Sequence, residues 1–207
     1  MHPNPTFRKT SRAQNIDFVA SMGFGTLVLA DGQGAPLLSH IPFVLDGDEV
    51  LFHLVRSNPM VRLLSEPRVA RLAVNGPHGY ISPDWYGISE QVPTWNYIAV
   101  HLTGACELLP QERLREILEA TSDRFEAPLA PKPVWKMDKM PDDVATRMMR
   151  QIVPCQLRIE AVDGTWKLSQ NKPDEARLAA AEGVAGSADG SELAALARWM
   201  RSPPEET

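Results

Sequence analysis

The sequence predicts a mainly β fold, an antiparallel β-barrel with peripheral helices. Short β-rich segments are grouped between residues 25 and 109 and are separated by Asp-Gly turns, which are strong hairpin signals. Helical patterns come mostly after these segments, and one strand returns near residue 155. The 18 prolines among 207 residues favour short strands and stiff loops over long helices.

The first half of the chain predicts a short helix followed by a β-meander. Ser11 can cap the helix, in which apolar residues from Ile16 to Met22 recur at helical spacing before glycines at 23 and 25 end it. Strands are expected at Gly25–Ala30, Leu37–Leu45, Glu49–Val55, Val69–Asn75, Gly79–Ser82 and Thr94–Leu109. Helical turns are expected at Ser57–Ser65, and an aromatic loop at 83–93.

The second half predicts helices around one returning strand. The expected order is a helix at Gln111–Phe125, a proline-rich loop at 127–140, a helix at Pro141–Ile152 and a strand at Cys155–Val162. Asp163-Gly164 is expected to turn the chain into the segment TWKLSQNK. A helix from Pro173 is interrupted by GVAGSADG and resumes at Ser191–Met200, and the final PPEET is expected to fray.

Composition and charge indicate a soluble globular protein of the cytoplasm. The chain is 43% apolar, and 21 Lys and Arg against 26 Asp and Glu give a net charge of −5. This mild acidity provides no general attraction to nucleic acid. The N-terminus lacks an apolar signal region, and no apolar run approaches the ~18 residues of a membrane span. Cys106 and Cys155 have no CxxC spacing, which excludes a disulfide scaffold and a zinc ribbon.

The turn at Asp46-Gly47 predicts that two histidines meet. If these are the central turn residues, Leu45 pairs with Asp48, and His40 lies directly opposite His53 on the outer face of the hairpin. The pair is either a polar patch that faces a ligand or two half-exposed histidines without a shared role. A metal site is not expected, because no third ligand has suitable spacing.

Polar side chains near residue 56 predict a place for a phosphate. Arg56 and Ser57 precede a helix that Asn58 can cap and Pro59 can open, so free backbone N–H groups lie beside a guanidinium. The same pattern also occurs at ordinary helix starts. Further donors are concentrated in WKLSQNK, at Lys167, Ser169, Gln170, Asn171 and Lys172. A G-x-G-x-x-G helix start and a P-loop motif are both missing from the sequence.

Five of the aromatic residues are concentrated between residues 80 and 97, at Tyr80, Trp85, Tyr86, Trp95 and Tyr97. Such rings suit stacking on a planar heterocycle or an interface, and they can also plug the end of a barrel. Three prolines stiffen this part of the chain. Thr94 and Asn96 are expected on the opposite face of the strand from Trp95 and Tyr97.

An ordered set of motifs identifies a family resemblance. The segments GFGTLVL, PLLSHIPF, HLVRSNP, GPHGYISPDWY, VPTWNY, HLTG and WKLSQNKP span roughly residues 20 to 183. Together they resemble the PaiB-like family of FMN-binding negative transcriptional regulators, within the flavin split-barrel class that includes pyridoxamine phosphate oxidases. The resemblance implies a six-stranded split barrel over residues 1–183 and places residues 184–207 in a C-terminal helical extension and tail.

The resemblance also implies a homodimer with one FMN per subunit, bound at the interface by residues of both chains. Ser39 and His40 would lie along one strand, and the ribityl phosphate would be approached by His53, Arg56, Ser57 and Asn58. Trp95 and Asn96 would lie near the ring or the ribityl chain, with further contributions from Gln170 and Asn171.

The sequence and the family resemblance suggest three functions. The first is an FMN-dependent oxidoreductase or flavin reductase that passes electrons from NADH or NADPH to a small acceptor, with no catalytic residue assigned. The second is a flavin-dependent negative regulator or a binding module without turnover. The sequence argues against direct DNA binding, because acidic residues offset the arginines of the helix at Gln111–Phe125. The third is haem binding through His40, His53 or His101.

Overall fold

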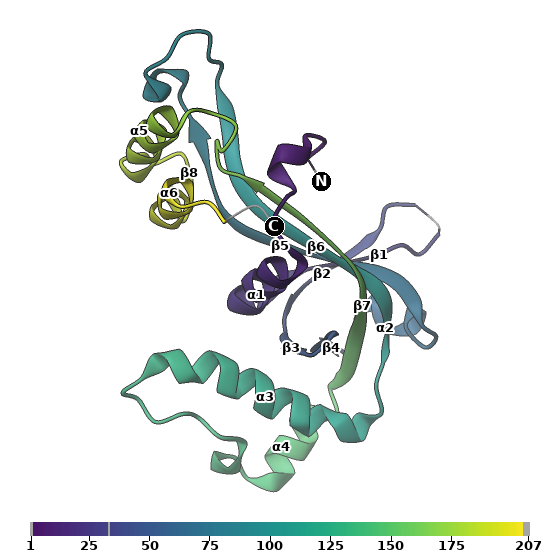
Figure 1. Cartoon of the computed structure of the whole chain (residues 1–207). Coiled ribbons are helices and arrows are strands. Elements are labelled where there is room, and N and C mark those ends of the chain that lie inside the picture. Colours follow the sequence, from purple (N-terminus) through teal and green to yellow (C-terminus); the bar gives the residue numbers. More distant parts are fainter. Residues whose placement is uncertain (1, 33, 205–207) are drawn as a thin grey trace. The chain divides into compact units, whose positions relative to one another are not determined.

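The computed structural model describes residues 2–32 and 34–204, which belong to two compact units. We call the first the terminal unit, composed of Met1–Val19, Val74–His101 and Val162–Thr207. The second, the central unit, is composed of Ala20–Ala73 and Leu102–Ala161. Three long strands, β5, β6 and β7, continue from one unit into the other (Figure 1).

The strands form one antiparallel sheet, which confirms the predicted mainly β class. The strands are β1 Phe24–Leu29, β2 Leu37–Pro42, β3 Val44–Asp46, β4 Glu49–Val55, β5 Arg68–Ile81, β6 Thr94–Leu108, β7 Ile152–Lys167 and β8 Gly190–Ser191. Their order is β2-β1-β5-β6-β7-β4-β3, and β8 pairs with β5. The described part of the chain therefore has eight strands where six were expected.

The described residues also form six α-helices. They are α1 Arg12–Met22, α2 Pro59–Leu63, α3 Leu114–Glu126, α4 Asp142–Met149, α5 Asp174–Ala185 and α6 Leu193–Arg201. Short 3-10 helices lie at Pro5–Phe7, Pro83–Tyr86, Gln111–Arg113, Ala127–Leu129 and Met137–Lys139. Within the described residues, none of the helices combines the length and apolar character that crossing a membrane requires.

In the central unit the sheet curls because its two edge strands are consecutive in the chain. Only Phe43 separates β2 from β3, and its backbone N–H donates to the carbonyl of Gly23 at 2.9 Å. Phe43 is fully buried, as are Leu27 of β1 and Val50 of β4. Burial alternates along β1, so one face of the strand lies in an apolar core.

The predicted hairpin register is wrong by two residues. Asp46 pairs with Glu49 and Leu45 with Val50, so Gly47 and Asp48 are the central turn residues. Gly47 has φ +57°, a conformation that glycine adopts without strain. His40 pairs with Thr26 of β1 and His53 with Pro154 of β7, so the two histidines are not cross-strand partners.

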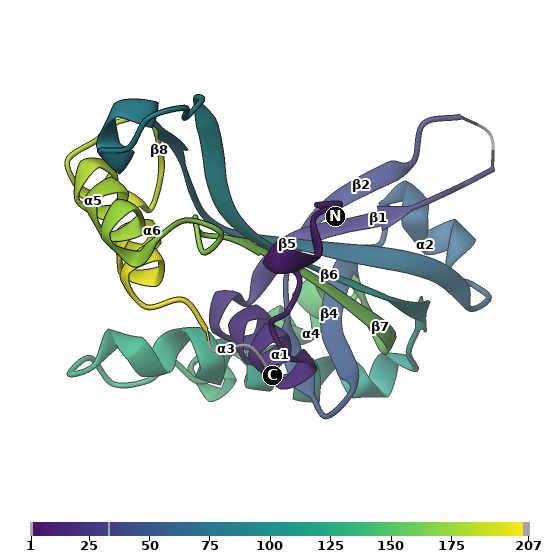
Figure 2. The same cartoon turned by 45° about the horizontal axis from the view of Figure 1, so that its top comes forward.

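The terminal unit contains α5, α6 and the far ends of the long strands. The two helices lie side by side in both views (Figures 1 and 2), and the buried guanidinium of Arg177 in α5 donates to the carbonyls of Met200 and Arg201. Gly183 leaves room for the ring of Trp85, because a Cβ there would lie 2.4 Å from the indole. The final helix therefore packs into this unit's core.

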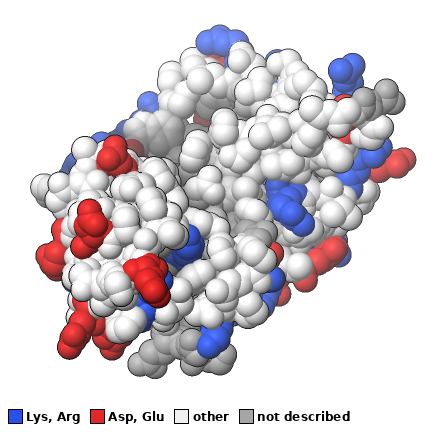
Figure 3. Space-filling view, turned by 90° about the horizontal axis from the view of Figure 1, so that it is seen from above, with Lys and Arg blue, Asp and Glu red and all other residues white. Residues whose placement is uncertain are grey.

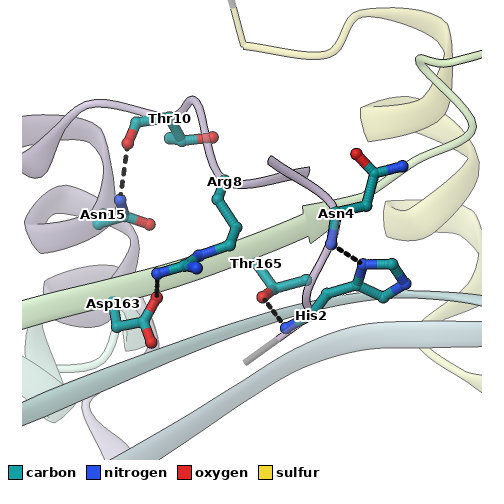
Figure 4. A network of polar contacts seen from close by, with 7 residues as sticks. All are labelled: His2, Asn4, Arg8, Thr10, Asn15, Asp163 and Thr165. Atoms are coloured by element: carbon teal, nitrogen blue, oxygen red, sulfur yellow. Dashed lines mark hydrogen bonds and ion pairs between the residues drawn. The ribbon is translucent and has the colours of Figure 1, made fainter. Parts of the chain in front are cut away.

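The N-terminal segment lies along β7 where a turn was predicted (Figure 4). Asp163 and Gly164 continue the strand, and Arg8 forms an ion pair with Asp163 at 3.1 Å. A Cβ at residue 164 would lie 2.0 Å from the side chain of Asn15. Gly164 is therefore needed for close packing of α1. The Oδ1 atom of Asn15 also accepts from the indole of Trp166 at 2.9 Å.

Two smaller predictions also differ from the structure, and two others concern residues that it does not describe. The segments predicted at 69–75 and 79–82 are one continuous strand, β5. The helix predicted to reach Ile152 ends at Met149, and Ile152 begins β7. The expected fraying of the tail falls mainly on 205–207, and the turn DGQG includes Gln33; these positions lie outside the described residues.

Candidate functional site

In the central unit, Asn58 is hydrogen-bonded to one other predicted site residue, Ser39. Its Oδ1 atom accepts from the backbone N–H of Met60 at 2.9 Å, which confirms the predicted helix cap. Its Nδ2 atom donates to Ser39 Oγ at 2.7 Å. Ser57 is exposed immediately before this cap. Ser39 of β2 and Asn58 at the start of α2 are therefore joined by a hydrogen bond, and Ser57 precedes Asn58 in the chain; we call these three residues the polar group of the central unit.

The side chain of Arg56 is hydrogen-bonded to the backbone at the start of β7. Its Nε atom donates to the carbonyl of Arg150 at 2.8 Å, and its Nη2 atom donates to that of Ile152 at 3.2 Å. The Nη2 atom also donates to Gln111 Oε1 at 3.0 Å. The side chain is exposed, so its charge remains near solvent. Arg56 thus has a structural role beside the predicted role at a phosphate.

The two predicted histidines have separate surroundings in the central unit. His40 Nδ1 lies 3.0 Å from Thr26 Oγ1, and its ring stacks on Phe24 with centroids 6.4 Å apart. His53 is half-buried on β4, and burial lowers its pKa below the ordinary value of 6.5. His53 is therefore neutral at pH 7.

In the terminal unit, Asn96 is one of the residues that line a cleft of about 200 Å³. We call it the Asn96 cleft. It is lined by Phe7, Tyr86, Glu90, Gln91, Val92, Thr94, Asn96, Lys167, Ser169, Asn171 and Lys172. These residues come from the N-terminal segment, the aromatic loop, β6 and the end of β7. The cleft therefore joins motifs that are far apart in the sequence.

Ser169 organises the floor of this cleft. Its Oγ atom lies 2.8 Å from the hydroxyl of Tyr86 and accepts from Asn96 Nδ2 at 2.8 Å. Ser169 has φ +64°, a left-handed conformation that costs energy for a residue with a Cβ. Burial raises the pKa of Tyr86, so its hydroxyl stays protonated and can donate.

The carbonyl oxygen of Asn96 is the unusual atom of the cleft. Asn96 is completely buried, and its Oδ1 atom has no hydrogen-bond partner among the described residues. A buried acceptor without a donor costs about 1–3 kcal/mol. Most such groups in proteins are paired, so an unpartnered acceptor in a residue that lines a cleft is a feature to explain.

Two lysines place positive charge at the same cleft. Lys167 Nζ donates to Thr94 Oγ1, and burial lowers the pKa of this amine. Lys172 Nζ donates to Gln91 Oε1 and lies 5.6 Å from the ring centroid of Tyr86. The cleft thus combines cationic donors with an aromatic ring and an open acceptor.

The remaining predicted residues of this unit do not all face the cleft. Asn171 lines it, whereas the Gln170 amide closes its own turn by accepting from Leu168 N at 2.8 Å and donating to the carbonyl of Trp166. Trp95 is 42% exposed and donates from Nε1 to His78 Nδ1 at 3.3 Å. As predicted, Asn96 and Trp95 lie on opposite faces of β6, one buried and one exposed.

Several residues of the cleft were not among the predicted site residues. Lys167, Ser169 and Lys172 belong to the donor-rich WKLSQNK segment, and Tyr86 belongs to the aromatic loop, so a signal for them exists in the sequence. Phe7 has no such signal, because only the fold brings the N-terminal segment to the cleft.

These residues fit a flavin in part. The open acceptor of Asn96 matches a ligand N–H or O–H, the lysines match negative charge, and Tyr86 offers a flat apolar ring. The volume of about 200 Å³ is below the 300–1,000 Å³ of typical ligand pockets, so the cleft holds a portion of such a molecule.

Comparisons with known proteins agree with the fold and the predicted cofactor. Residues 1–161 match the family described as "Putative FMN-binding domain". Protease synthase and sporulation protein PAI 2 of Bacillus subtilis (strain 168) is 31% identical over 173 residues, covering 81% of this chain and 82% of that protein.

Solved structures share the fold at lower identity. The FAD and heme binding protein from Mycobacterium smegmatis has a TM-score of 0.58 at 21% identity and covers 89% of this chain and 82% of its own. Flavocytochrome Anf3 from Azotobacter vinelandii has a TM-score of 0.61 at 15% identity, with coverage of 80% and 72%. The family match confirms the predicted resemblance and FMN as the expected cofactor. The chain belongs to the "Putative FMN-binding domain" family and is similar in sequence to PAI 2 of Bacillus subtilis.

Proposed function

We propose that this chain is an FMN-binding flavoprotein and that the Asn96 cleft holds part of the flavin. The observation that carries this proposal is the buried, unpartnered Oδ1 atom of Asn96 in a chain of the FMN-binding family. A donor on the ligand would remove the cost of that atom. Lys167, Lys172 and Asn171 would add donors, and Tyr86 would add an apolar wall.

The second part of the proposed site is the polar group of the central unit. Ser39, Ser57 and Asn58 would approach the ribityl phosphate, with Arg56 supplying charge. His40 and His53 belong to the same proposed set. In a homodimer these residues and the Asn96 cleft can come from different copies of the chain, as expected for a cofactor at an interface.

Exposed apolar side chains of the central unit support the homodimer. Phe24, Leu38 and Val69 are 53%, 61% and 69% exposed. They belong to β1, β2 and β5, which are neighbours in the sheet. Large apolar side chains that share an exposed region of sheet are typical of a protein interface.

The proposed activity is electron transfer from a nicotinamide donor to a small acceptor. FMN supplies hydride and single-electron chemistry when it is bound. The chain would contribute binding and orientation: the protonated Tyr86 and Ser169 hold the Asn96 amide in place. Cys106 and Cys155 are buried, and burial raises the thiol pKa of Cys106 to about 12, so neither thiol suits a redox role.

We do not propose DNA recognition by the segment 111–126, because two of its arginines are paired with carboxylates. Arg113 forms an ion pair with Glu116 at 2.7 Å, and Arg115 forms one with Glu119 at 3.5 Å. Figure 3 views the molecule from the top of Figure 1, a side other than that of α3, and there too Lys and Arg side chains stand among acidic and uncharged ones. A continuous basic surface is what nucleic-acid recognition requires.

The test is the spectrum of the purified full-length chain, followed by acid release and identification of the chromophore. We expect flavin absorption, release of FMN at about one per chain, and oxidation of NADH or NADPH under air. A colourless protein that fails to retain added FMN would overturn the proposed binding. A Soret band instead would favour the haem alternative through His40, His53 or His101. Flavin without NADH or NADPH oxidation would overturn only the proposed activity.

A further inference from the structure

The central unit contains a second cleft with different chemistry. Its lining residues belong to α3, the loop that follows, α4 and the start of β7, and its volume is about 300 Å³. Figure 1 shows α3 and α4. We call it the methionine cleft. It is lined by Leu118, Ser122, Trp135, Met137, Met140, Ala145, Met148, Met149, Gln151 and Ile152.

The lining of the methionine cleft is uncharged. Its polar side chains are Ser122 and Gln151, and the others are apolar or aromatic. Methionine side chains are flexible and polarisable, so several of them around one space adapt to ligands of different shapes. An apolar lining with a few polar groups is typical of sites for small molecules. The same lining disfavours an anion or a charged peptide.

The methionine cleft is open to solvent on one side and has a volume of about 300 Å³. Water in it finds few hydrogen-bond partners on the apolar walls. Met148 is 55% exposed at the rim, whereas Ala145 is buried. The cleft is therefore open to solvent beside Met148 and closed on the side of Ala145.

Polar contacts hold the loop wall of the cleft against α3. Lys136 Nζ lies 2.6 Å from Asp123 Oδ1, and the backbone N–H of Trp135 donates to Glu126 Oε2 at 2.9 Å. Neither contact uses an apolar side chain of the lining.

A second set of polar contacts holds the end of α4. Gln111 Nε2 donates to the carbonyls of Met149 and Ile152, both at 3.3 Å. Because the walls are held by groups outside the apolar lining, the space is formed before any molecule enters. A preformed site loses little free energy to ordering when it binds.

We propose that the methionine cleft binds a small, uncharged, apolar molecule, of hydrocarbon or aromatic character. Ser122 and Gln151 can accept or donate one hydrogen bond to such a molecule. The chain's own elements form both walls, and the volume lies at the lower limit for small-molecule pockets, which favours this occupant over a helix of another protein. This inference does not depend on the proposed flavin binding.

The test uses the uncharged fluorescent probe 1-N-phenylnaphthylamine with the full-length chain. We expect saturable probe fluorescence, with energy transfer that decreases in Trp135→Phe. Met148→Glu places a charge at the rim and should weaken probe binding by about tenfold or more. Thr146→Glu adds the same charge on α4 outside the lining, and binding should stay within about twofold of the wild type.

A second variant keeps the test valid if Met148→Glu unfolds the chain. Ser122→Phe fills the cleft with an apolar ring and should also reduce probe binding, while circular dichroism remains unchanged. Three results would overturn the proposal: no saturable binding, equal effects of Met148→Glu and Thr146→Glu, or probe binding that appears only when sedimentation shows dissociation of a dimer. The last result would assign the cleft to contact between copies of the chain.

Discussion

The two polar groups of the proposed flavin site differ in how far the chain satisfies them. In the central unit, Asn58 and Arg56 direct their donors to Ser39, Gln111 and backbone carbonyls. In the terminal unit, the buried Oδ1 atom of Asn96 has no partner among the described residues. The first group therefore supports the fold even when empty, whereas the second has an acceptor that only a ligand or water would satisfy. Substitutions in the two groups should separate stability from binding.

The largest combined effect is expected for Arg56→Ala. Loss of the bonds to Arg150, Ile152 and Gln111 should lower the free energy of unfolding by about 1–3 kcal/mol. Loss of its charge should also weaken FMN binding by ~1.5–3 kcal/mol. Urea unfolding of the apoprotein and FMN titration measure the two effects separately. Arg56→Lys is the control, and unchanged flavin retention in Arg56→Ala through dialysis would remove Arg56 from the site.

Asn96→Leu should act mainly on binding. The variant loses the bond to Ser169 but also removes the unpartnered acceptor, so its apo stability should stay within about 1 kcal/mol of the wild type. FMN affinity should fall by about 1–3 kcal/mol, measured by quenching of flavin fluorescence. Trp95→Phe, on the opposite face of β6, is the matched control. Equal affinities for wild type and Asn96→Leu would show that the Asn96 cleft takes no part in binding.

A smaller effect is expected at Ser169, whose backbone is left-handed. Ser169→Ala and Ser169→Gly both remove the hydroxyl that contacts Tyr86 and Asn96. Glycine also relieves the cost of φ +64°, so Ser169→Gly should be more stable than Ser169→Ala by about 1 kcal/mol. Thermal and urea unfolding of the pair measure this difference. An alanine variant as stable as the glycine variant would contradict the assignment of backbone strain.

The smallest effect concerns pH and His53. Because burial lowers its pKa, the folded chain binds fewer protons than the unfolded chain from the ordinary value of 6.5 down to the lowered value. This contribution to the free energy of unfolding is lost as pH falls through that window. His53→Gln should therefore lose less stability than the wild type between pH 7.5 and 5.5 in urea unfolding. Identical losses would indicate that His53 is not buried in solution.

The starts of two helices could be predicted from the sequence, because capping involves only neighbouring residues. Ser11 was expected to cap α1, and its Oγ atom accepts from the N–H of Gln14 at 3.2 Å. Asn58 and Pro59 likewise begin α2 as expected. These features depend on a few neighbouring residues, so the sequence contains the whole signal.

The predictions that were wrong depend on contacts between residues far apart in the sequence. Asp163-Gly164 has the composition of a turn, but Arg8 and Asn15 pack against it and keep it in a strand. The expected pairing of His40 with His53 required one continuous strand from Leu37 to Leu45. The chain instead forms β2 and β3 on either side of Phe43, and β2 pairs with β1 while β3 pairs with β4. The Asn96 cleft needs Phe7 beside β6, which no local pattern indicates.

Hydrogen-deuterium exchange with and without FMN tests the proposed flavin site most directly, because it locates the ligand on the chain. We expect FMN to slow exchange in peptides covering 94–97 and 166–172, and in peptides covering 56–60. If FMN binds and leaves both segments of the Asn96 cleft unprotected, the open acceptor of Asn96 has another explanation and the proposed site is wrong.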